Sequence, residues 1–210
     1  MERLRILIAD DHRMVAEGLR SLLAPDYELV EIVENGRALF EAARRLQPDL
    51  IVADISMPLL NGLDAVEQIR SLGCQAKVIF LTMHKDAMYA ARALRSGATG
   101  FLLKHSASEE LLTAIQEVLA GRMYITPVIA ELLDRLPDRL SNSVVALTRR
   151  QREVLQLFAE GHSAKQVAKI LHISARTAEG HKAQIMGLLG ANSTAELVQC
   201  AIRHGVITPS

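Results

Sequence analysis

Five short apolar runs alternate with amphipathic stretches over the first 120 residues, and this alternation constrains the fold more than any other feature. Runs of this kind are continuous or alternate with period two, as in strands, and they lie near 4–9, 27–33, 49–53, 77–82 and 100–103. The apolar period of about 3.6 residues between them predicts helices near 13–24, 36–46, 62–71, 85–96 and 107–120. Right-handed crossovers would place these helices on both faces of one parallel sheet. We therefore expect an α/β domain.

Three carboxylates directly follow two of these runs. Asp10 and Asp11 end the first run, and Asp54 ends the run that begins at Leu50. If the two strands are neighbours, the acids meet at the carboxyl edge of the sheet, where open α/β sheets bind ligands. Clustered carboxylates suit Mg²⁺, and a metal can organise a phosphoryl group for attack by a carboxylate. Asp11 alone could equally cap the next helix, but the three acids together indicate a magnesium site beside a nucleophile.

Two further runs also end in polar side chains, Thr82 and Lys104. In the order Asp10-Asp11, Asp54, Thr82, Lys104, the chain resembles the receiver domain of two-component response regulators over residues 3–121. Matching segments are Asp54-Ile55-Ser56-Met57-Pro58 with Gly62, Thr82-Met83-His84, and Gly100-Phe101-Leu102-Leu103-Lys104. The expected fold is a flavodoxin-like (βα)5 receiver with a parallel sheet.

The resemblance implies a role for each acid. Asp54 would be the phospho-acceptor, and Lys104 would pair with its carboxylate or its phosphate. Mg²⁺ would be held by Asp11, Asp54 and the backbone carbonyl of Ser56, with Asp10 acting through water. The implied phosphodonor is a sensor histidine kinase.

Two more residues take switch roles from the same resemblance. The Thr82 hydroxyl would turn toward the phosphate and vacate space for Phe101. This movement would couple phosphorylation to the surface made by the fourth helix and the fifth strand. An ordinary core aromatic is the alternative interpretation of Phe101.

The last 60 or so residues are predicted to be helical throughout. Helix starts are indicated by the capping-box pairs Thr148 with Gln151, Ser163 with Gln166 and Ser193 with Glu196. Gly161, Gly190 and Gly205 supply the stops, which gives helices near 149–160, 164–171, 175–189 and 194–204. The second and third helices are joined only by His172-Ile173-Ser174, as in a helix-turn-helix.

This all-α four-helix segment resembles the LuxR-type DNA-binding domain of NarL/FixJ response regulators. Matching stretches are Leu147–Leu155, Gly161 with Ser163, Ile173-Ser174 before Thr177 and His181, Ile185-Met186, and Leu189-Gly190. We expect a receiver at 3–121, a linker with a short helix at 122–146, and the DNA-binding domain at 147–210. The short helix starts at Thr126-Pro127, and residues 137–147 form a polar linker. Ser106 with Glu109 would cap the fifth helix of the receiver, and Gly121 follows its end.

The third of these helices can also be interpreted from its own residues. Ala178, His181, Ile185 and Leu188 share one side and should pack inward. The outward side could reach base edges in a major groove, and flanking side chains could contact phosphates. The predicted DNA-contacting residues are Lys165, Ser174, Arg176, Thr177, Glu179, Gly180, His181, Lys182 and Ala183.

Composition agrees with this division of the chain. Residues 1–140 hold 16 basic and 20 acidic side chains, whereas residues 141–210 hold 8 basic and 4 acidic ones. The basic excess of the second part favours nucleic-acid binding, although such an excess is common on ordinary surfaces. Cys74 and Cys200 lie far apart without metal-ligand spacing, so we expect inert thiols. Without an apolar stretch of about 18 residues or a signal peptide, we expect a cytoplasmic protein with no membrane contact.

The predicted function is therefore a DNA-binding transcriptional response regulator and not an enzyme. Its implied partners are promoter half-sites in double-stranded DNA, the kinase, RNA polymerase, and a second copy of the chain when active. An aspartyl-nucleophile phosphohydrolase is disfavoured because Ile55 and Ser56 follow Asp54 in place of a D-x-D motif. A dinucleotide enzyme would need G-x-G-x-x-G where Asp10-Asp11-His12 stands. A receiver that regulates DNA binding without phosphorylation remains the closer alternative.

Overall fold

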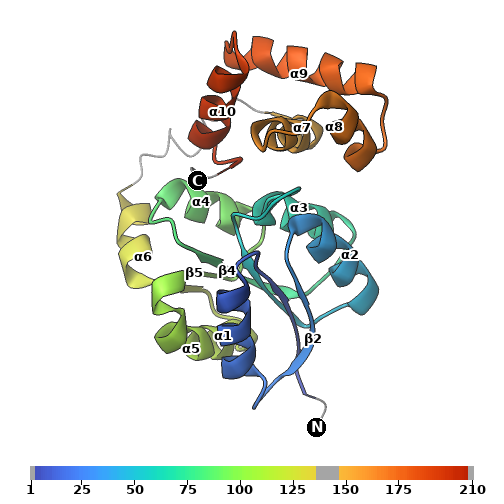
Figure 1. Ribbon diagram of the computed structural model, residues 1–210. Coiled ribbons are helices and arrows are strands. Elements are labelled where there is room, and N and C mark those ends of the chain that lie inside the picture. Colours follow the sequence, from blue (N-terminus) through green and yellow to red (C-terminus); the bar gives the residue numbers. More distant parts are fainter. Residues whose placement is uncertain (1–2, 136–146, 208–210) are drawn as a thin grey trace.

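A computed structural model describes residues 3–135 and 147–207. Residues 3–135 form a sheet domain, and residues 147–207 form a helical domain that lies beyond the carboxyl edge of the sheet (Figure 1). The six strands of the sheet pair in parallel in the order β2-β1-β3-β4-β5-β6. They are β1 Arg5–Ala9, β2 Glu28–Val33, β3 Leu50–Asp54, β4 Lys77–Thr82, β5 Gly100–Leu103 and β6 Tyr124–Ile125.

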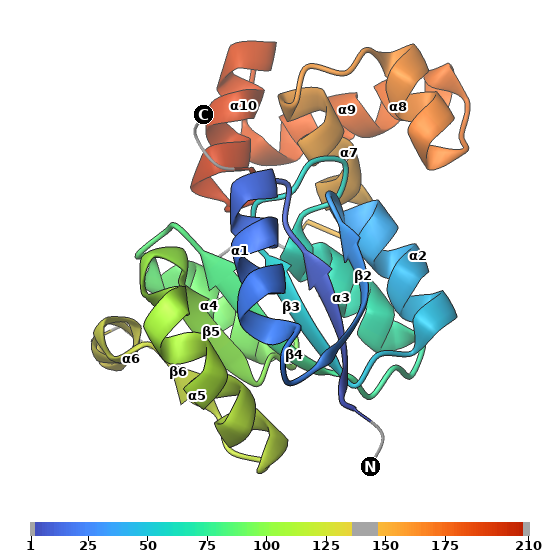
Figure 2. The same ribbon diagram turned by 60° about the horizontal axis from the view of Figure 1, so that its bottom comes forward.

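Helices cover both faces of the sheet, as the crossover rule predicted (Figure 2). The helices of this domain are α1 Arg13–Leu23, α2 Gly36–Leu46, α3 Gly62–Ser71, α4 Ala87–Arg95, α5 Ala107–Leu119 and α6 Pro127–Asp134. On one face, α1 and α5 pack through Leu19 and Leu111 against Ile6 and Ile8. The opposite face carries α2, α3, α4 and α6 over a second buried cluster. The central strand β3 is buried at every residue, so only its carboxyl end is available for chemistry.

The sheet extends beyond the five predicted strands. β6 pairs with β5, and the Thr126 amide donates to the Phe101 carbonyl at 3.0 Å. Thr126 then leads into α6, whose Ile129 is buried against the sheet domain. The sequence predicts α6 but not β6, because a two-residue strand is too short to show a period.

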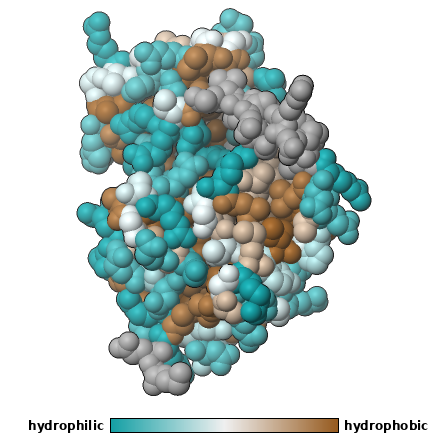
Figure 3. All heavy atoms as spheres, turned by 180° about the vertical axis from the view of Figure 1, so that it is seen from behind, coloured by the Kyte–Doolittle hydropathy of each residue, from teal (hydrophilic) through white to brown (hydrophobic). Residues whose placement is uncertain are grey.

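The surface predicted to carry the phosphorylation signal, made by α4 and β5, is therefore partly covered. β6 lies along β5, and α6 lies against α4. Apolar side chains gather on the side of the molecule where α4 and α6 lie together (Figure 3). Leu132 and Leu133 of α6 are partly buried there against the core.

The helical domain consists of four helices with a core of their own. They are α7 Arg149–Ala159, α8 Ala164–Leu171, α9 Ala175–Leu189 and α10 Thr194–Arg203, within two residues of the predicted bounds. Ala178 and Ile185 of α9 are buried in this core, as predicted. Leu188 is 53% exposed, so its predicted inward position was wrong. Met186 and Leu189 pack inward instead, because the apolar stripe of α9 shifts around the helix toward its end.

Most of the predicted helix starts are confirmed. The capping boxes of Thr148 with Gln151 and of Ser163 with Gln166 are both complete. Ser193 caps α10, but the Glu196 carboxylate accepts from the amide of Asn192, so that box is only half formed.

The capping box predicted for α5 was wrong. The Ser106 side chain makes no cap bond and donates instead to the Leu103 carbonyl, because a short 3₁₀ turn at Lys104–Ser106 precedes the helix. The glycines predicted to end the helices of the second domain, Gly161, Gly190 and Gly205, all have positive φ. This backbone conformation is the one that commonly ends a helix.

The linker predicted at 137–147 lies outside the described residues apart from Leu147, which is buried in the core of the helical domain. Within the described parts of the chain, no single helix is long and apolar enough to cross a membrane. Only taken together do α9 and α10 have the length and apolar composition of a membrane span, and the two helices meet at a bend of 66°.

Candidate functional site

The predicted acids meet at the carboxyl edge of the sheet. Because Ala9 of β1 is in register with Ala53 of β3, the next residues Asp10 and Asp54 lie side by side. Lys104, just after β5, reaches across this edge. Its ammonium group lies 2.7 Å from Asp54 Oδ2 and 3.0 Å from Asp10 Oδ1. The side chains of three residues that are far apart in the sequence therefore form one buried cluster.

The electrostatics of this cluster follow from its excess of acids. Burial raises the pKa of Asp54, and the neighbouring Asp10 adds to that effect, while Lys104 opposes it. Burial alone would lower the pKa of Lys104, but the Asp54 charge and hydrogen bonds to Asp10 and Asp54 outweigh it, so this pKa is raised. The lysine is held charged, whereas the carboxylates repel each other. Such a site favours an added cation.

The donor set fits a hard divalent cation. Asp10, Asp11, His12 and Asp54 can each offer one ligand atom, and these atoms lie within 4.8 Å of one another. Asp10 Oδ2 lies 2.8 Å from Lys104 Nζ but accepts no aligned hydrogen bond, so it has free coordinating capacity. His12 was not predicted as part of the site. Its Nδ1 lies 2.8 Å from Asp11 Oδ1, and its only signal in the sequence is its position next to the acid pair.

The two predicted switch residues are both buried. Thr82 ends β4, and its hydroxyl oxygen accepts a hydrogen bond from the His84 amide at 3.1 Å. Phe101 is fully buried in the core of the sheet domain, one strand away from Thr82. The backbone carbonyl of Phe101 is the group that binds Thr126, so the switch position is tied directly to the segment that leads into α6.

Residues 55–61 between β3 and α3 form a loop that we call the acceptor loop, after the predicted role of Asp54. The Ser56 amide donates to Asp54 Oδ1 at 3.2 Å, and the Gly62 amide donates to the Ile55 carbonyl at 2.8 Å, which closes the loop. Glycine is needed at position 62, because a Cβ there would lie 2.0 Å from the carbonyl oxygen of Asp54. The loop thereby holds the Ser56 backbone beside the acid cluster.

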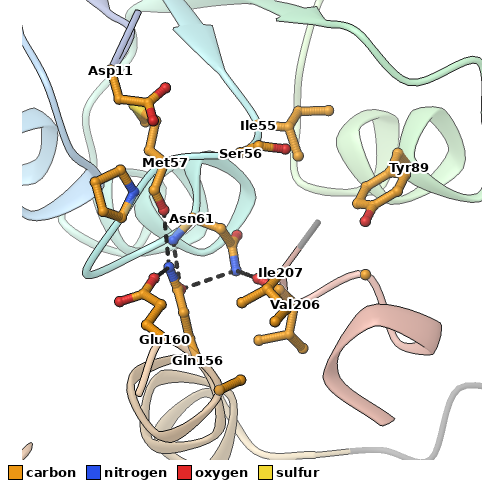
Figure 4. A pocket seen from close by; sticks show the side chains of 13 residues that line it. Asp11, Ile55, Ser56, Met57, Asn61, Tyr89, Gln156, Glu160, Val206 and Ile207 are labelled. Carbon is orange, nitrogen blue, oxygen red and sulfur yellow. Dashed lines mark hydrogen bonds between the residues drawn. The ribbon is translucent and has the colours of Figure 1, made fainter. Parts of the chain in front are cut away.

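A cavity of about 390 Å³ opens between the acceptor loop and the helical domain. Asp11 and Ser56 line it from the sheet domain, and Gln156 and Glu160 line it from the helical domain (Figure 4). Burial raises the pKa of Glu160, an effect opposed by hydrogen bonds from Gln156 and from the Leu59 amide. The sequence did not predict Gln156 of α7 or the C-cap residue Glu160 as part of the site, since their partners lie about 100 positions away in the chain.

The predicted DNA-contacting residues lie mostly on the exposed side of α9. Arg176, Glu179, Gly180 and Ala183 are all exposed, and we call them the reading face. Lys165 on α8 is also exposed.

The side chains of the remaining predicted DNA-contacting residues already interact within the helical domain or are half-buried. The hydroxyl of Ser174 caps α9 and lies 2.8 Å from that of Thr177. His181 and Lys182 are half-buried, and the Lys182 ammonium stands 4.9 Å from the centre of the Phe158 ring. Lys182 therefore already has a partner within the domain, whereas Lys165 is the more accessible cation.

Comparison with known proteins gives the same two parts. Residues 6–116 match the response regulator receiver domain family, and residues 145–201 match the luxR family of bacterial regulatory proteins. The transcriptional regulatory protein MctR of Rhizobium johnstonii is 32% identical over 209 residues, which cover 98% of this chain and 96% of MctR.

Solved structures resemble the chain over nearly its full length. The RcsB response regulator of Salmonella typhimurium is 26% identical and has a TM-score of 0.66, with 97% of this chain and 99% of RcsB covered. An RcsB–DNA complex is also 26% identical and has a TM-score of 0.60, with 95% and 98% covered.

Proposed function

Because the chain belongs to the NarL/FixJ family of response regulators, we propose that it regulates transcription by binding DNA under the control of phosphorylation at Asp54. The observation that carries this proposal is the Lys104 ammonium group held between Asp54 and Asp10 at the carboxyl edge of the sheet. Two similar proteins support the DNA-binding part. MctR is a transcriptional regulatory protein, and RcsB has been solved with DNA.

The acceptor chemistry assigns one task to each residue. Mg²⁺ would be held by Asp11, Asp54 and the Ser56 carbonyl, with Asp10 acting through water, and when bound it would neutralise charge on the phosphoryl oxygens. A carboxylate oxygen of Asp54 forms a bond to phosphorus while the bond between phosphorus and the donor breaks. Lys104 then pairs with the new phosphoryl group.

The signal would pass from the acceptor to the rest of the chain through Thr82 and Phe101. Phosphorylation supplies only the difference in free energy between two existing conformations. The active form is a homodimer, whose two helix-turn-helix units would contact half-sites about one helical turn apart.

The phosphodonor is a sensor histidine kinase, and RNA polymerase is a further partner at the promoter. The protein acts in the cytoplasm, where its DNA lies. Its functional division is a receiver at 3–121, a connecting segment at 122–146 and a DNA-binding domain at 147–210.

Labelling with a small phosphodonor tests the acceptor. The wild-type chain should gain one phosphoryl group only when Mg²⁺ is present, and Asp54→Asn should gain none. Asp11→Ala should weaken Mg²⁺ binding without unfolding the domain, because two remaining carboxylates repel each other less than three do. Undiminished labelling of Asp54→Asn would contradict the assignment of the acceptor.

DNA binding and molecular mass, measured with and without beryllofluoride, test the regulation. Both should rise when beryllofluoride and Mg²⁺ are present. If both stay unchanged while the DNA still binds, the receiver regulates DNA binding by a route that does not involve phosphorylation.

A further inference from the structure

The sheet domain binds the helical domain through α7. The Gln156 side chain, which is 1% exposed, donates to the Met57 carbonyl at 2.9 Å and accepts from the Asn61 amide at 2.8 Å. One turn further on, the Glu160 carboxylate accepts from the Leu59 amide at 3.2 Å. Gln156 of α7 and Glu160 at its C-cap therefore bind backbone groups of the acceptor loop.

Charged groups strengthen the same contact. Arg152 of α7 donates to the buried carboxylate of Asp64 at 2.6 Å and also pairs with Glu67. The Asp64 carboxylate also accepts a hydrogen bond from the guanidinium group of Arg92 at 2.8 Å. Buried ion pairs with this many hydrogen bonds are strongly destabilised when one partner is removed. The docked arrangement is thus held by specific groups as well as by apolar packing.

The turn after α10 completes the contact. Asn61 Nδ2 reaches the Val206 carbonyl at 3.5 Å, and Val206 is only 2% exposed. Gly205 lies against the Tyr89 ring, where a Cβ would come within 3.0 Å of the ring. Within residues 3–135 and 147–207, all hydrogen bonds and ion pairs between the two domains come from α7, its C-cap Glu160 and Val206.

Within residues 3–135 and 147–207, the reading face takes no part in the hydrogen bonds and ion pairs of this contact. In Figures 1 and 2, α7 lies between α9 and the sheet domain. Arg176, Glu179, Gly180 and Ala183 are exposed in the docked chain, as is Lys165 on α8. The sheet domain therefore occupies a different side of the helix-turn-helix from the one that would enter a major groove.

We infer that the docked chain is competent to bind DNA: the sheet domain covers α7 and leaves the reading face open. This inference rests on the proposed DNA-binding function. It implies that undocking is not required for one chain to contact one half-site. Control by phosphorylation then acts on the pairing of chains and not on access to α9.

A covalent lock between the domains tests this inference. In Glu67→Cys/Arg152→Cys, the two thiols can be joined by bismaleimidoethane, while Cys74 and Cys200 are buried and protected. The control is the same variant with its thiols blocked by N-ethylmaleimide. The probe is a short duplex that carries one half-site, selected from random DNA with the blocked control.

The cross-linked chain should bind this duplex within about twofold of the blocked control, which is less than 1 kcal/mol. A loss of about tenfold or more on cross-linking would overturn the inference. If neither form binds any duplex at low salt, the proposed DNA-binding function itself fails, and the inference fails with it.

A second set of variants tests the opposite change. Gln156→Ala and Arg152→Ala should weaken docking and enlarge the radius of gyration in solution scattering, whereas the exposed Arg149→Ala should not. Affinity for the single half-site should stay within about twofold in all three variants. A gain of about tenfold that appears only in the undocked variants would show that docking blocks DNA, and would overturn the inference.

Discussion

At the residue scale, the buried acid cluster lowers the free energy of unfolding at neutral pH. The pKa of Asp54 is raised above its ordinary value of 3.8 by burial, so its ionised form is destabilised in the folded chain. Between that value and the raised pKa, the folded chain binds more protons than the unfolded chain. The free energy of unfolding therefore falls as pH rises through this window, and it loses the full contribution of Asp54 above the raised pKa.

Asp54→Asn should therefore raise the free energy of unfolding at pH 7 in EDTA, by about 1.4 kcal/mol for each unit of raised pKa. The gain should shrink as pH falls toward 4. Lys104→Met, which leaves the acids without a counter-charge, should cost about 3 to 5 kcal/mol. Urea unfolding at several pH values measures both changes, and a destabilised Asp54→Asn at pH 7 would contradict this account.

Two glycines provide a matched pair at the same scale. A Cβ at Gly62 would lie 2.0 Å from the Asp54 carbonyl oxygen, whereas a Cβ at Gly180 meets nothing within 4 Å. Gly62→Ala should destabilise the sheet domain by about 2 kcal/mol or more and impair labelling of Asp54. Gly180→Ala should stabilise α9 by about 0.5 to 1 kcal/mol. Equal effects in thermal unfolding would show that the acceptor loop adapts to the extra carbon.

At the element scale, the helix caps separate side chains that stabilise from those that only match a pattern. Ser163 forms a complete capping box at α8, while Ser106 makes no cap bond at α5. Ser163→Ala should therefore cost about 1 kcal/mol, and Ser106→Ala should cost less than half as much. Circular-dichroism melts of each variant measure the two changes. A larger cost for Ser106→Ala would mean that the cap forms in solution.

Substitutions in the elements proposed to contact DNA should have two kinds of effect. Lys165→Ala should weaken binding to every sequence alike and reduce the salt slope by about one unit. Glu179→Ala should relax preference at one base pair and cost about 1 to 3 kcal/mol on the best site only. Salt-titrated binding to a selected site and to scrambled DNA measures both. Equal losses on both DNAs for Glu179→Ala would leave Arg176 as the principal reader.

At the scale of the whole molecule, the proposed phosphorylation signal would have to reach a surface, made by α4 and β5, that β6 and α6 partly cover. Thr82→Ala should accept a phosphoryl group yet dimerise poorly, because the acceptor would lose the side chain that couples it to Phe101. Sizing chromatography of the phosphorylated variant, with its labelling measured in parallel, tests this. A fully phosphorylated Thr82→Ala that dimerises like the wild type would exclude this coupling route.

The sequence by itself determined the order and bounds of nearly all the elements. Apolar periods and capping pairs are local signals, and the structure has β4, α2, α3, α8 and α9 with the bounds that these signals predicted. The acid cluster was also predictable, because parallel strands bring their carboxyl ends to one edge of the sheet. Two predictions were wrong for local reasons. A 3₁₀ turn precedes α5 in place of the predicted cap, and Leu188 is exposed because the apolar stripe shifts around α9.

Only the tertiary structure decided how the two domains meet. Gln156 and Arg152 look like ordinary polar residues of an amphipathic helix, and their partners Met57, Asn61 and Asp64 are 88 to 99 positions away. No local period encodes such a pairing, because it depends on the shape and charge of two separately formed surfaces. The same holds for β6, which is a strand only because the edge of β5 is there to bind it.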